Sequence, residues 1–587
     1  MLFPGGSWAS AREGSISRAS LDTLNRLTQP PGPDSSHGYH PQVNDEAPPR
    51  PRFAGLTRAQ RNALLLYVPF AVFVLLTFCM TTDDPFITLR YAANIVHGHG
   101  PVFNVGQQPV EGFSSPLDLL VVVVAYIIPG GYSLLMIKLA SLLFGVLTLR
   151  SARSLVDGLD LPEWGRSLAL FLTGASWTLA VASSNGLETT LTAWLTTTLV
   201  ANLLTGRACR KPLAVGFIAA GVALTRPEGI GMVLVLAAVS LGVWTSYPRA
   251  IQRVAWALPA VGVTLLATVI RILYYKEPLA NTYYAKHVPL SSALHTGTLY
   301  LNDLLLLNRD EVNAGAAARA LLTLLGLALT GVFLVGLVAI IRRRTVLVIV
   351  AAAVLAQVVF ILLVGGDWMW GGRFLAPVAP LIAVVDAFGV VAIVRRATRA
   401  ARPPSKWIRI LVIGIVSAAT VIPIIALRDP VWDSHGHFDT ASLFAASDGG
   451  GFPISVWLAG DRALSCARPG EVVTYSEVGY AGFTHLDVQF LDIRGLTDRT
   501  IARHTPPANR KYYGVVLDPS WQTSASRIGA EILRQHATSV LTFDLFRHRA
   551  TVLGGAFTYV GSRVVAGQTL YLYIRAGTTC HAAGFTN

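Results

Sequence analysis

Charged residues are scarce in this sequence. Asp, Glu, Lys and Arg make up 14% of its 587 residues, whereas hydrophobic residues make up 52%. A typical soluble domain has about a quarter of its residues charged. The scarcity excludes an ordinary soluble enzyme, and the long apolar runs predict a polytopic α-helical membrane protein.

The sequence also lacks the motifs of nucleotide-dependent enzymes. It has no Walker motif, no GxGxxG after a strand and no DxD in a soluble region. The net charge of +14 would suit nucleic acid, but the positive residues stand between apolar runs, as the positive-inside rule produces, so no nucleic-acid partner is predicted.

Cysteine is nearly absent too. Of the four cysteines, Cys79 and Cys209 suggest no metal site. Cys466 and Cys580 fall in a polar C-terminal part and could pair there if that part is extracytoplasmic.

Composition divides the chain into three parts. Residues 1–57, rich in Pro, Gly, Ser and Arg, are predicted to be a disordered cytoplasmic tail. Residues 58–427 hold the apolar runs and are predicted to be the transmembrane catalytic domain. Residues 428–587 are more polar and carry short strand-like stretches, which predicts a soluble extracytoplasmic α/β domain.

The charges beside each apolar run predict an orientation. Arg58 and Arg61 place the N-terminus inside, and a surface helix at 117–129 keeps the later basic loops inside as well. The result is about eleven spans with the N-terminus in and the C-terminus out. The predicted spans are 63–80, 132–149, 165–183, 189–206, 212–225, 229–247, 254–275, 317–341, 346–364, 374–395 and 407–427.

With this orientation, nearly every polar motif of the membrane region lies on the outer face. These motifs are at residues 83–84, 110–116, 185–189, 225–229, 281–286 and 365–373. Structural turns would be divided between the two faces, so the common side predicts an active site on the extracytoplasmic face of a bacterial plasma membrane.

Asp83 and Asp84 follow the first predicted span directly. Adjacent carboxylates at a membrane surface repel each other and are costly to desolvate, which favours a functional role. One of them is expected to cap the helix that Pro85 begins, which leaves the other as a general base.

The remaining polar residues have structural alternatives as well as functional ones. Glu188 fits a turn, Arg226 and Glu228 fit a local ion pair beside Pro227, and the basic side chains can extend to the interface. As functional groups, Arg226, Lys286 and Arg373 are predicted to bind the phosphate of a lipid-linked donor.

The motifs together resemble those of GT-C membrane glycosyltransferases. The resemblance rests on DDPFITLRYAAN at 83–94, the segments 98–104, 111–112, 186–189, 226–228 and 278–282, and GGDWM at 365–369 with Arg373. Within GT-C it is similar to the actinobacterial arabinofuranosyltransferases that cap cell-wall arabinan, over about residues 60–500. The chain departs from that family after the aspartate pair and in the EGFSSP segment at 111–116, which touches the acceptor-facing loop.

The resemblance implies an inverting transfer from a polyprenyl-phosphate sugar, best matched by decaprenyl-phosphoryl arabinofuranose, to a glycan hydroxyl. It implies Asp83 as the base, supported by Asp84. We expect substrate contacts from Glu111, Glu188, Glu228, Asn281, Tyr284, Asp367 and Trp368. No cofactor is predicted with certainty; a divalent cation held by Asp83, Asp84 and Asp367 is the weaker expectation.

Other functions stay open at this point. A mannosyl- or aminoarabinosyl-transferase would use the same fold with a different donor or acceptor. A lipid-sugar transporter needs polar groups on both faces, which the one-sided placement disfavours. A non-catalytic assembly factor should tolerate the loss of the acidic pair.

Overall fold

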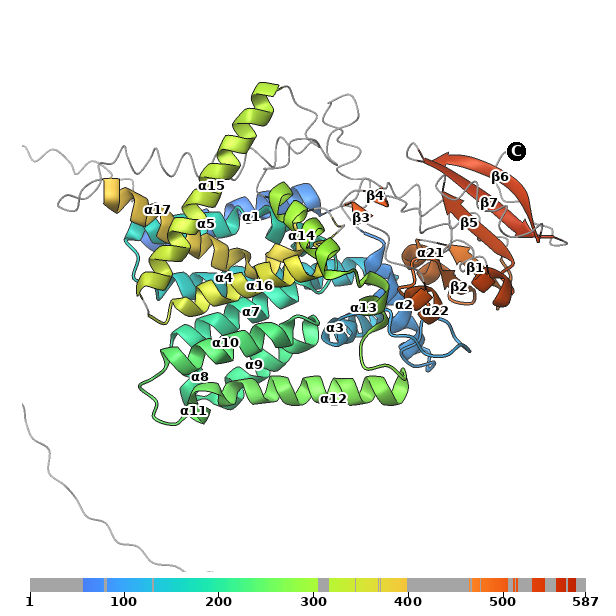
Figure 1. Ribbon diagram of the computed structural model, residues 1–587, viewed down its shortest axis with the longest axis horizontal. Helices are drawn as coiled ribbons and strands as arrows, with labels where there is room; N and C mark the ends of the chain where they lie inside the picture. Colours follow the sequence, from blue (N-terminus) through green and yellow to red (C-terminus); the bar gives the residue numbers. More distant parts are fainter. Residues whose placement is uncertain are drawn as a thin grey trace, which may run out of the picture. The chain divides into compact units, whose positions relative to one another are not determined.

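The computed structural model describes residues 56–78, 82–128, 131–304, 316–343, 345–367, 369, 371–397, 464, 467–475, 477–504, 510–511, 514–515, 530–543, 556–565 and 568–576. Helices dominate up to residue 397, and strands occur only after residue 471 among these described residues (Figure 1). The predicted tail at 1–57 (but for its last two residues), the span at 407–427, Cys79, Cys466 and Cys580 lie outside the description.

The apolar runs fold into helices close to the predicted bounds. The longer helices are α1 (Arg58–Thr77), α3 (Pro116–Ile127), α4 (Ser133–Asp157), α5 (Glu163–Gly174), α6 (Trp177–Ser184), α7 (Thr189–Leu204), α9 (Pro212–Thr225), α10 (Gly229–Val243), α12 (Leu258–Tyr274), α14 (Leu290–Leu304), α15 (Ala316–Arg343), α16 (Val348–Val364) and α17 (Ala379–Ala397). The predicted span 165–183 is two helices, because the chain breaks at Ala175 and Ser176 caps α6 by accepting from the Leu179 N–H.

Further helical elements, all but the first of them short, join these helices. They are α2 (Asp84–Val96), α8 (Arg207–Arg210), α11 (Ala250–Val254), the 3-10 helix η2 (Ala255–Ala257), α13 (Asn281–Lys286) and the 3-10 helix η3 (Arg373–Val378). The polar motifs therefore lie at helix ends or in these short elements, where side chains can leave the apolar packing.

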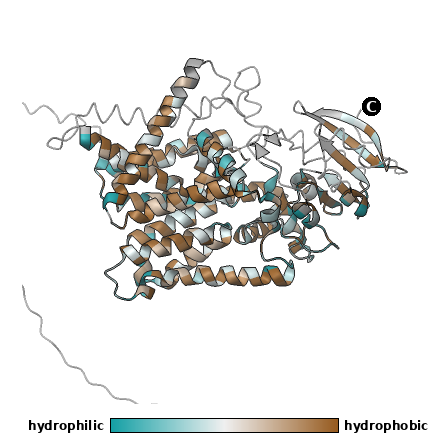
Figure 2. Cartoon of the chain, viewed as in Figure 1, coloured by the Kyte–Doolittle hydropathy of each residue, from teal (hydrophilic) through white to brown (hydrophobic). Residues whose placement is uncertain are grey.

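Within the part of the chain that the structure describes, six helical stretches are long and apolar enough to cross a membrane: 58–77, 133–157, 163–184, 250–274, 323–343 and 373–396. Figure 2 shows the hydrophobic colour running over the helices from α1 to α17. By length and composition such stretches fit the predicted helical membrane protein. The count of about eleven spans and the orientation stay predictions.

Glycine lets two of the long helices approach closely. A Cβ at Gly336 of α15 would lie 2.0 Å from the carbonyl oxygen of Val385, and one at Gly389 of α17 would lie 2.1 Å from that of Val332. Since neither position has room for a side chain, the two backbones touch, which is how small residues hold helices together in membranes.

The C-terminal sheet region (the described residues between 464 and 576) contains one mixed five-stranded sheet in the order β2-β1-β5-β7-β6. β1 pairs in parallel with β2 and β5, whereas β7 is antiparallel to β5 and β6. Its elements are β1 (Val472–Tyr475), α21 (Val478–Thr484), β2 (Gln489–Asp492), α22 (Arg499–His504), β5 (Ser539–Phe543), β6 (Phe557–Val565) and β7 (Gln568–Arg575), with a separate pair of β3 (Arg510–Lys511) and β4 (Gly514–Val515). The structure thus has a small sheet with helices where the sequence predicts one, while its identity as a separate extracytoplasmic domain and its boundary at 428 stay predictions.

Helix α2 holds α21 by both ends. The Asp83 carboxylate accepts the N–H groups of Gly479 and Tyr480, at 2.6 and 2.8 Å, in the first turn of α21. Seven residues further along, Arg90 donates to the carbonyl oxygens of Gly482 and His485 at the end of the same helix. A carboxylate suits the positive end of a helix and a guanidinium its negative end, so both contacts stabilise the docking of α21 on α2.

Arg90 is the central side chain of this contact. It is fully buried, it also donates to the carbonyl oxygens of Phe103 (2.6 Å) and Val488 (2.7 Å), and it lies over the rings of Phe103 and Phe490. We expect Arg90→Met to lower the free energy of unfolding by about 3 kcal/mol or more, because several buried carbonyl groups would lose their donor.

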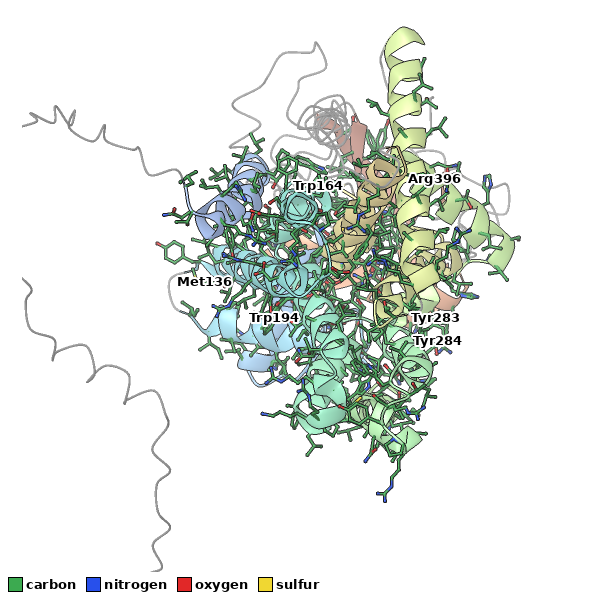
Figure 3. All side chains as sticks on the ribbon, turned by 90° about the vertical axis from the view of Figure 1, so that its left-hand side faces the viewer. Met136, Trp164, Trp194, Tyr283, Tyr284 and Arg396 are labelled. Carbon is green, nitrogen blue, oxygen red and sulfur yellow. The ribbon has the colours of Figure 1, made fainter. Side chains whose placement is uncertain are left out.

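Thermal unfolding of the purified protein, together with limited proteolysis of the C-terminal sheet region, measures this effect. Arg90→Lys keeps the charge but not the planar set of donors, so it should recover little of the stability that Arg90→Met loses. Arg396→Gln, at an exposed position on α17, is the matched control (Figure 3). An Arg90→Met protein as stable as this control would contradict the assignment.

Candidate active site

The two adjacent aspartates have different surroundings. Asp83 occupies the N-cap position of α2, yet its side chain does not cap that helix, which corrects the expectation of a local cap. Its two oxygens instead accept backbone N–H groups of α21, because that helix start lies against it. Pro85 stands in the first turn of α2, as expected.

Asp84 has no hydrogen bond or ion pair to its carboxylate among the described residues, and it is partly accessible. Burial raises the pKa of Asp84; the charges of Lys286 and Arg373 lower it, and those of Asp367 and Glu477 raise it. These groups come from α13, η3, the loop before η3 and the start of α21. Asp84 therefore lies where four separate segments bring charged side chains together.

Asp83 is a weaker candidate for accepting a proton from a substrate. Burial raises the pKa of Asp83, as does the charge of Glu477, while the two N–H donors of α21 oppose that change. Both of its oxygens already have donors, so a substrate hydroxyl would have to compete with them.

Arg226 lies between two of the predicted glutamates. Its Nη1 donates to Glu188 at 2.6 Å, and its Nε donates to Glu228. All three side chains are less than 10% exposed. The local Arg226–Glu228 pair predicted as a structural alternative is present, and Glu188 from the start of α7 joins it.

Arg373 and Asp367 form a second buried pair. Two hydrogen bonds of 2.6 and 3.2 Å join the guanidinium to the two carboxylate oxygens. The ring of Phe374 lies beside both arginines, with its centroid 4.8 Å from Cζ of Arg226 and 5.5 Å from Cζ of Arg373. The helix ends near 188, 226 and 373 thus form one polar cluster.

Glu111 and Asn281 lie together in a second group. Glu111 is buried, its Oε2 accepts from Arg271 Nε at 2.7 Å, and its backbone oxygen accepts from the Asn281 N–H at 3.0 Å. Burial raises the pKa of Glu111 and Arg271 opposes this. These contacts attach α13 to the loop before α3.

Tyr284 contacts residues other than Asp84. It packs beside Tyr283, with ring centroids 5.5 Å apart (Figure 3), and under the guanidinium of Arg503 in α22. Its observed role is to join α13 to α22. Trp368 lies outside the described residues.

The residues predicted for a divalent cation do not fit one. Among the described residues, no three His, Cys, Asp or Glu side chains are placed to hold a metal ion. Asp83 is committed to α21 and Asp367 to Arg373.

Sequence reasoning missed Arg494. Its Nη2 donates to Glu477 at 2.7 Å, next to Asp83 and Asp84, and its side chain is 47% exposed. The sequence gives only a weak signal for Arg494, because an arginine followed by Gly495 does not differ from the sequence of an ordinary turn.

The Arg226 cluster leads to a test of stability. Replacing Arg226 with Met leaves two buried carboxylates without a partner, so we expect a loss of about 3 to 5 kcal/mol in the free energy of unfolding. The triple variant E188Q/R226M/E228Q removes both charges and should recover most of that loss. Thermal unfolding compares them; an R226M protein of wild-type stability would contradict the buried pairing.

No protein-family model and no curated protein matches this chain. Among solved structures, it is similar to the archaeal oligosaccharyltransferase AglB from Archaeoglobus fulgidus in complex with an inhibitory peptide and a dolichol-phosphate, at a TM-score of 0.50 and 12% identity, over 87% of this chain and 74% of that one. The apo form of the oligosaccharyltransferase from the same organism gives the same values.

ArnT from Cupriavidus metallidurans bound to undecaprenyl phosphate matches at a TM-score of 0.45 and 13% identity, over 87% of this chain and 97% of that one. At such identities the likeness concerns the fold. The chain therefore shares the overall fold of the archaeal oligosaccharyltransferase.

Proposed function

We propose that this protein is a glycosyltransferase that moves a sugar from a polyprenyl-phosphate donor to an acceptor hydroxyl. One observation carries the proposal: Asp84, which has no hydrogen-bonded partner among the described residues, lies within reach of the charges of Lys286 and Arg373. A base beside cations is what this transfer needs. The likeness in fold to a transferase solved with a dolichol-phosphate supports a lipid-phosphate donor.

In this proposal Asp84, rather than the predicted Asp83, is the general base. Asp84 takes the proton of the acceptor hydroxyl as its oxygen attacks the anomeric carbon. The bond from that carbon to the phosphate oxygen breaks, and polyprenyl phosphate leaves with the electron pair. Attack opposite the leaving group inverts the anomeric carbon.

Lys286 and Arg373 stabilise the charge that develops on the leaving phosphate. Arg373 with Asp367 is a neutral pair, so it can still bind an anion through Nη1. Arg226 with two glutamates carries a net negative charge, which repels a phosphate. We therefore assign Arg226 to shaping the site and not, as predicted, to the donor phosphate.

The sugar and the acceptor rest on the sequence resemblance. We propose arabinofuranose from decaprenyl-phosphoryl arabinofuranose, transferred to a cell-wall glycan at the outer face of a bacterial plasma membrane. Transfer to a protein is the second candidate, since the similar archaeal structure was solved with an inhibitory peptide. Mannosyl and aminoarabinosyl donors are distinguished by the same product assay, and a non-enzymatic transporter by a transport measurement in vesicles.

The test incubates purified protein with decaprenyl-phosphoryl arabinofuranose and a short arabinan, and detects the product by mass spectrometry. We expect Asp84→Asn to lower the turnover number by about a hundredfold to ten-thousandfold, because the general base is lost. Asp83→Asn keeps one acceptor oxygen for α21, so it should lower stability by about 1 kcal/mol and retain far more turnover.

A larger loss of turnover in Asp83→Asn than in Asp84→Asn would identify Asp83 as the general base. Transfer only from polyprenyl-phosphate mannose or another donor would keep the reaction class and discard arabinose. Movement of lipid-linked sugar across vesicles without any product would favour a transporter.

The pH profile of transfer tests the base independently. Because the pKa of Asp84 is raised above 3.8, the fraction of ionised base, and with it kcat/KM, should rise with pH through a midpoint above that value. Glu477 contributes to this raised pKa, so Glu477→Gln should move the midpoint to lower pH. A profile unchanged in Glu477→Gln would argue against Asp84 as the titrating group.

A further inference from the structure

The C-terminal sheet region presents a cation next to the proposed base. Arg494 follows β2, and its backbone N–H donates to the Asp492 carboxylate at 2.8 Å. Asp492 is fully buried and also accepts the Thr497 N–H at 3.0 Å. Gly495 has φ +76°, and a Cβ there would lie 2.7 Å from the Ala502 nitrogen, so the turn that carries Arg494 is narrowly defined.

Glu477 holds the Arg494 guanidinium by a hydrogen bond. It is the N-cap residue of α21, but Asp83 already accepts the first N–H groups of that helix. The Glu477 carboxylate is therefore available to accept from Arg494 Nη2 at 2.7 Å. The other nitrogens of the guanidinium have no hydrogen-bond partner among the described residues, and the side chain is about half exposed.

Asn281 connects this turn to the segment that carries Lys286. Its side-chain amide donates to the carbonyl oxygens of Gly495, Leu496 and Asp498, at 2.7, 3.0 and 3.3 Å. Asn281 begins α13, which ends at Lys286. The positions of Lys286 and Arg494 are thus fixed relative to each other through one buried amide.

We propose that Arg494 is a further phosphate-binding residue, which acts with Lys286 on the phosphate of the polyprenyl-phosphate donor. This inference rests on the proposed function and adds a ligand from the C-terminal sheet region to its site. The charge of Asp84 acts on Arg494, which agrees with both groups facing one substrate. A guanidinium offers several donors in one plane, so it can keep Glu477 and bind a phosphate oxygen as well.

Direct binding of decaprenyl phosphate to the full-length protein tests the inference. Native mass spectrometry or thermophoresis gives the Kd without requiring turnover. We expect Arg494→Gln to weaken binding by about tenfold or more, since a charge-assisted hydrogen bond is lost. Arg494→Lys keeps the charge but not the planar set of donors. Its Kd should therefore lie between those of the wild type and Arg494→Gln.

Arg534→Gln is the matched control, because Arg534 is an exposed arginine of the same region that pairs with Glu531. It should bind decaprenyl phosphate like the wild type. Wild-type affinity in Arg494→Gln, or a loss confined to the KM of the acceptor, would overturn the inference and leave the proposed function standing. Absence of binding by the wild-type protein would instead overturn the proposed function itself.

Discussion

The hold of α2 on α21 is the constraint on which the candidate site depends. Asp83 and Arg90 contact opposite ends of one short helix, and both use backbone groups as partners. The partners lie nearly four hundred residues away along the chain. This contact fixes Glu477, at the start of α21, near Asp84, because nothing in the local sequence brings β1 and β2 to the start of α2.

Most buried cations of the site have a carboxylate partner, and the number of carboxylates differs from one cation to the next. Arg226 has two carboxylates, Arg373 has one, and Arg90 donates to neutral oxygens. A desolvated charge without compensation would be costly, so these pairs set what each arginine can do. The surplus of negative charge at Arg226 suits a structural role, and the neutral pair at Arg373 leaves a donor for an anion.

The sequence predicted the helices well and the side-chain partners poorly. Apolar runs and their flanking charges place α7, α9 and α16 within a few residues, because burial in a membrane acts on every residue of a run. Pairs close in sequence, Arg226 with Glu228 and Arg373 with Asp367, were also within reach of local reasoning. The role of Asp83 was not, since only the tertiary fold brings Gly479 to it and leaves its neighbour Asp84 as the available carboxylate.

Position and charge are supplied by different residues in this site. Asp83, Arg90 and Asn281 attach α2, α13 and the turn after β2 to one another through hydrogen bonds to backbone groups. Such bonds fix the segments without neutralising the charged side chains those segments carry. In the proposed mechanism Asp84 then keeps its charge for a substrate, and in a site of low dielectric a field held in place before the reaction is worth more than one that must reorganise during it. The two adjacent aspartates therefore differ: Asp83 fixes the position of α21, and Asp84 is left for the proposed chemistry.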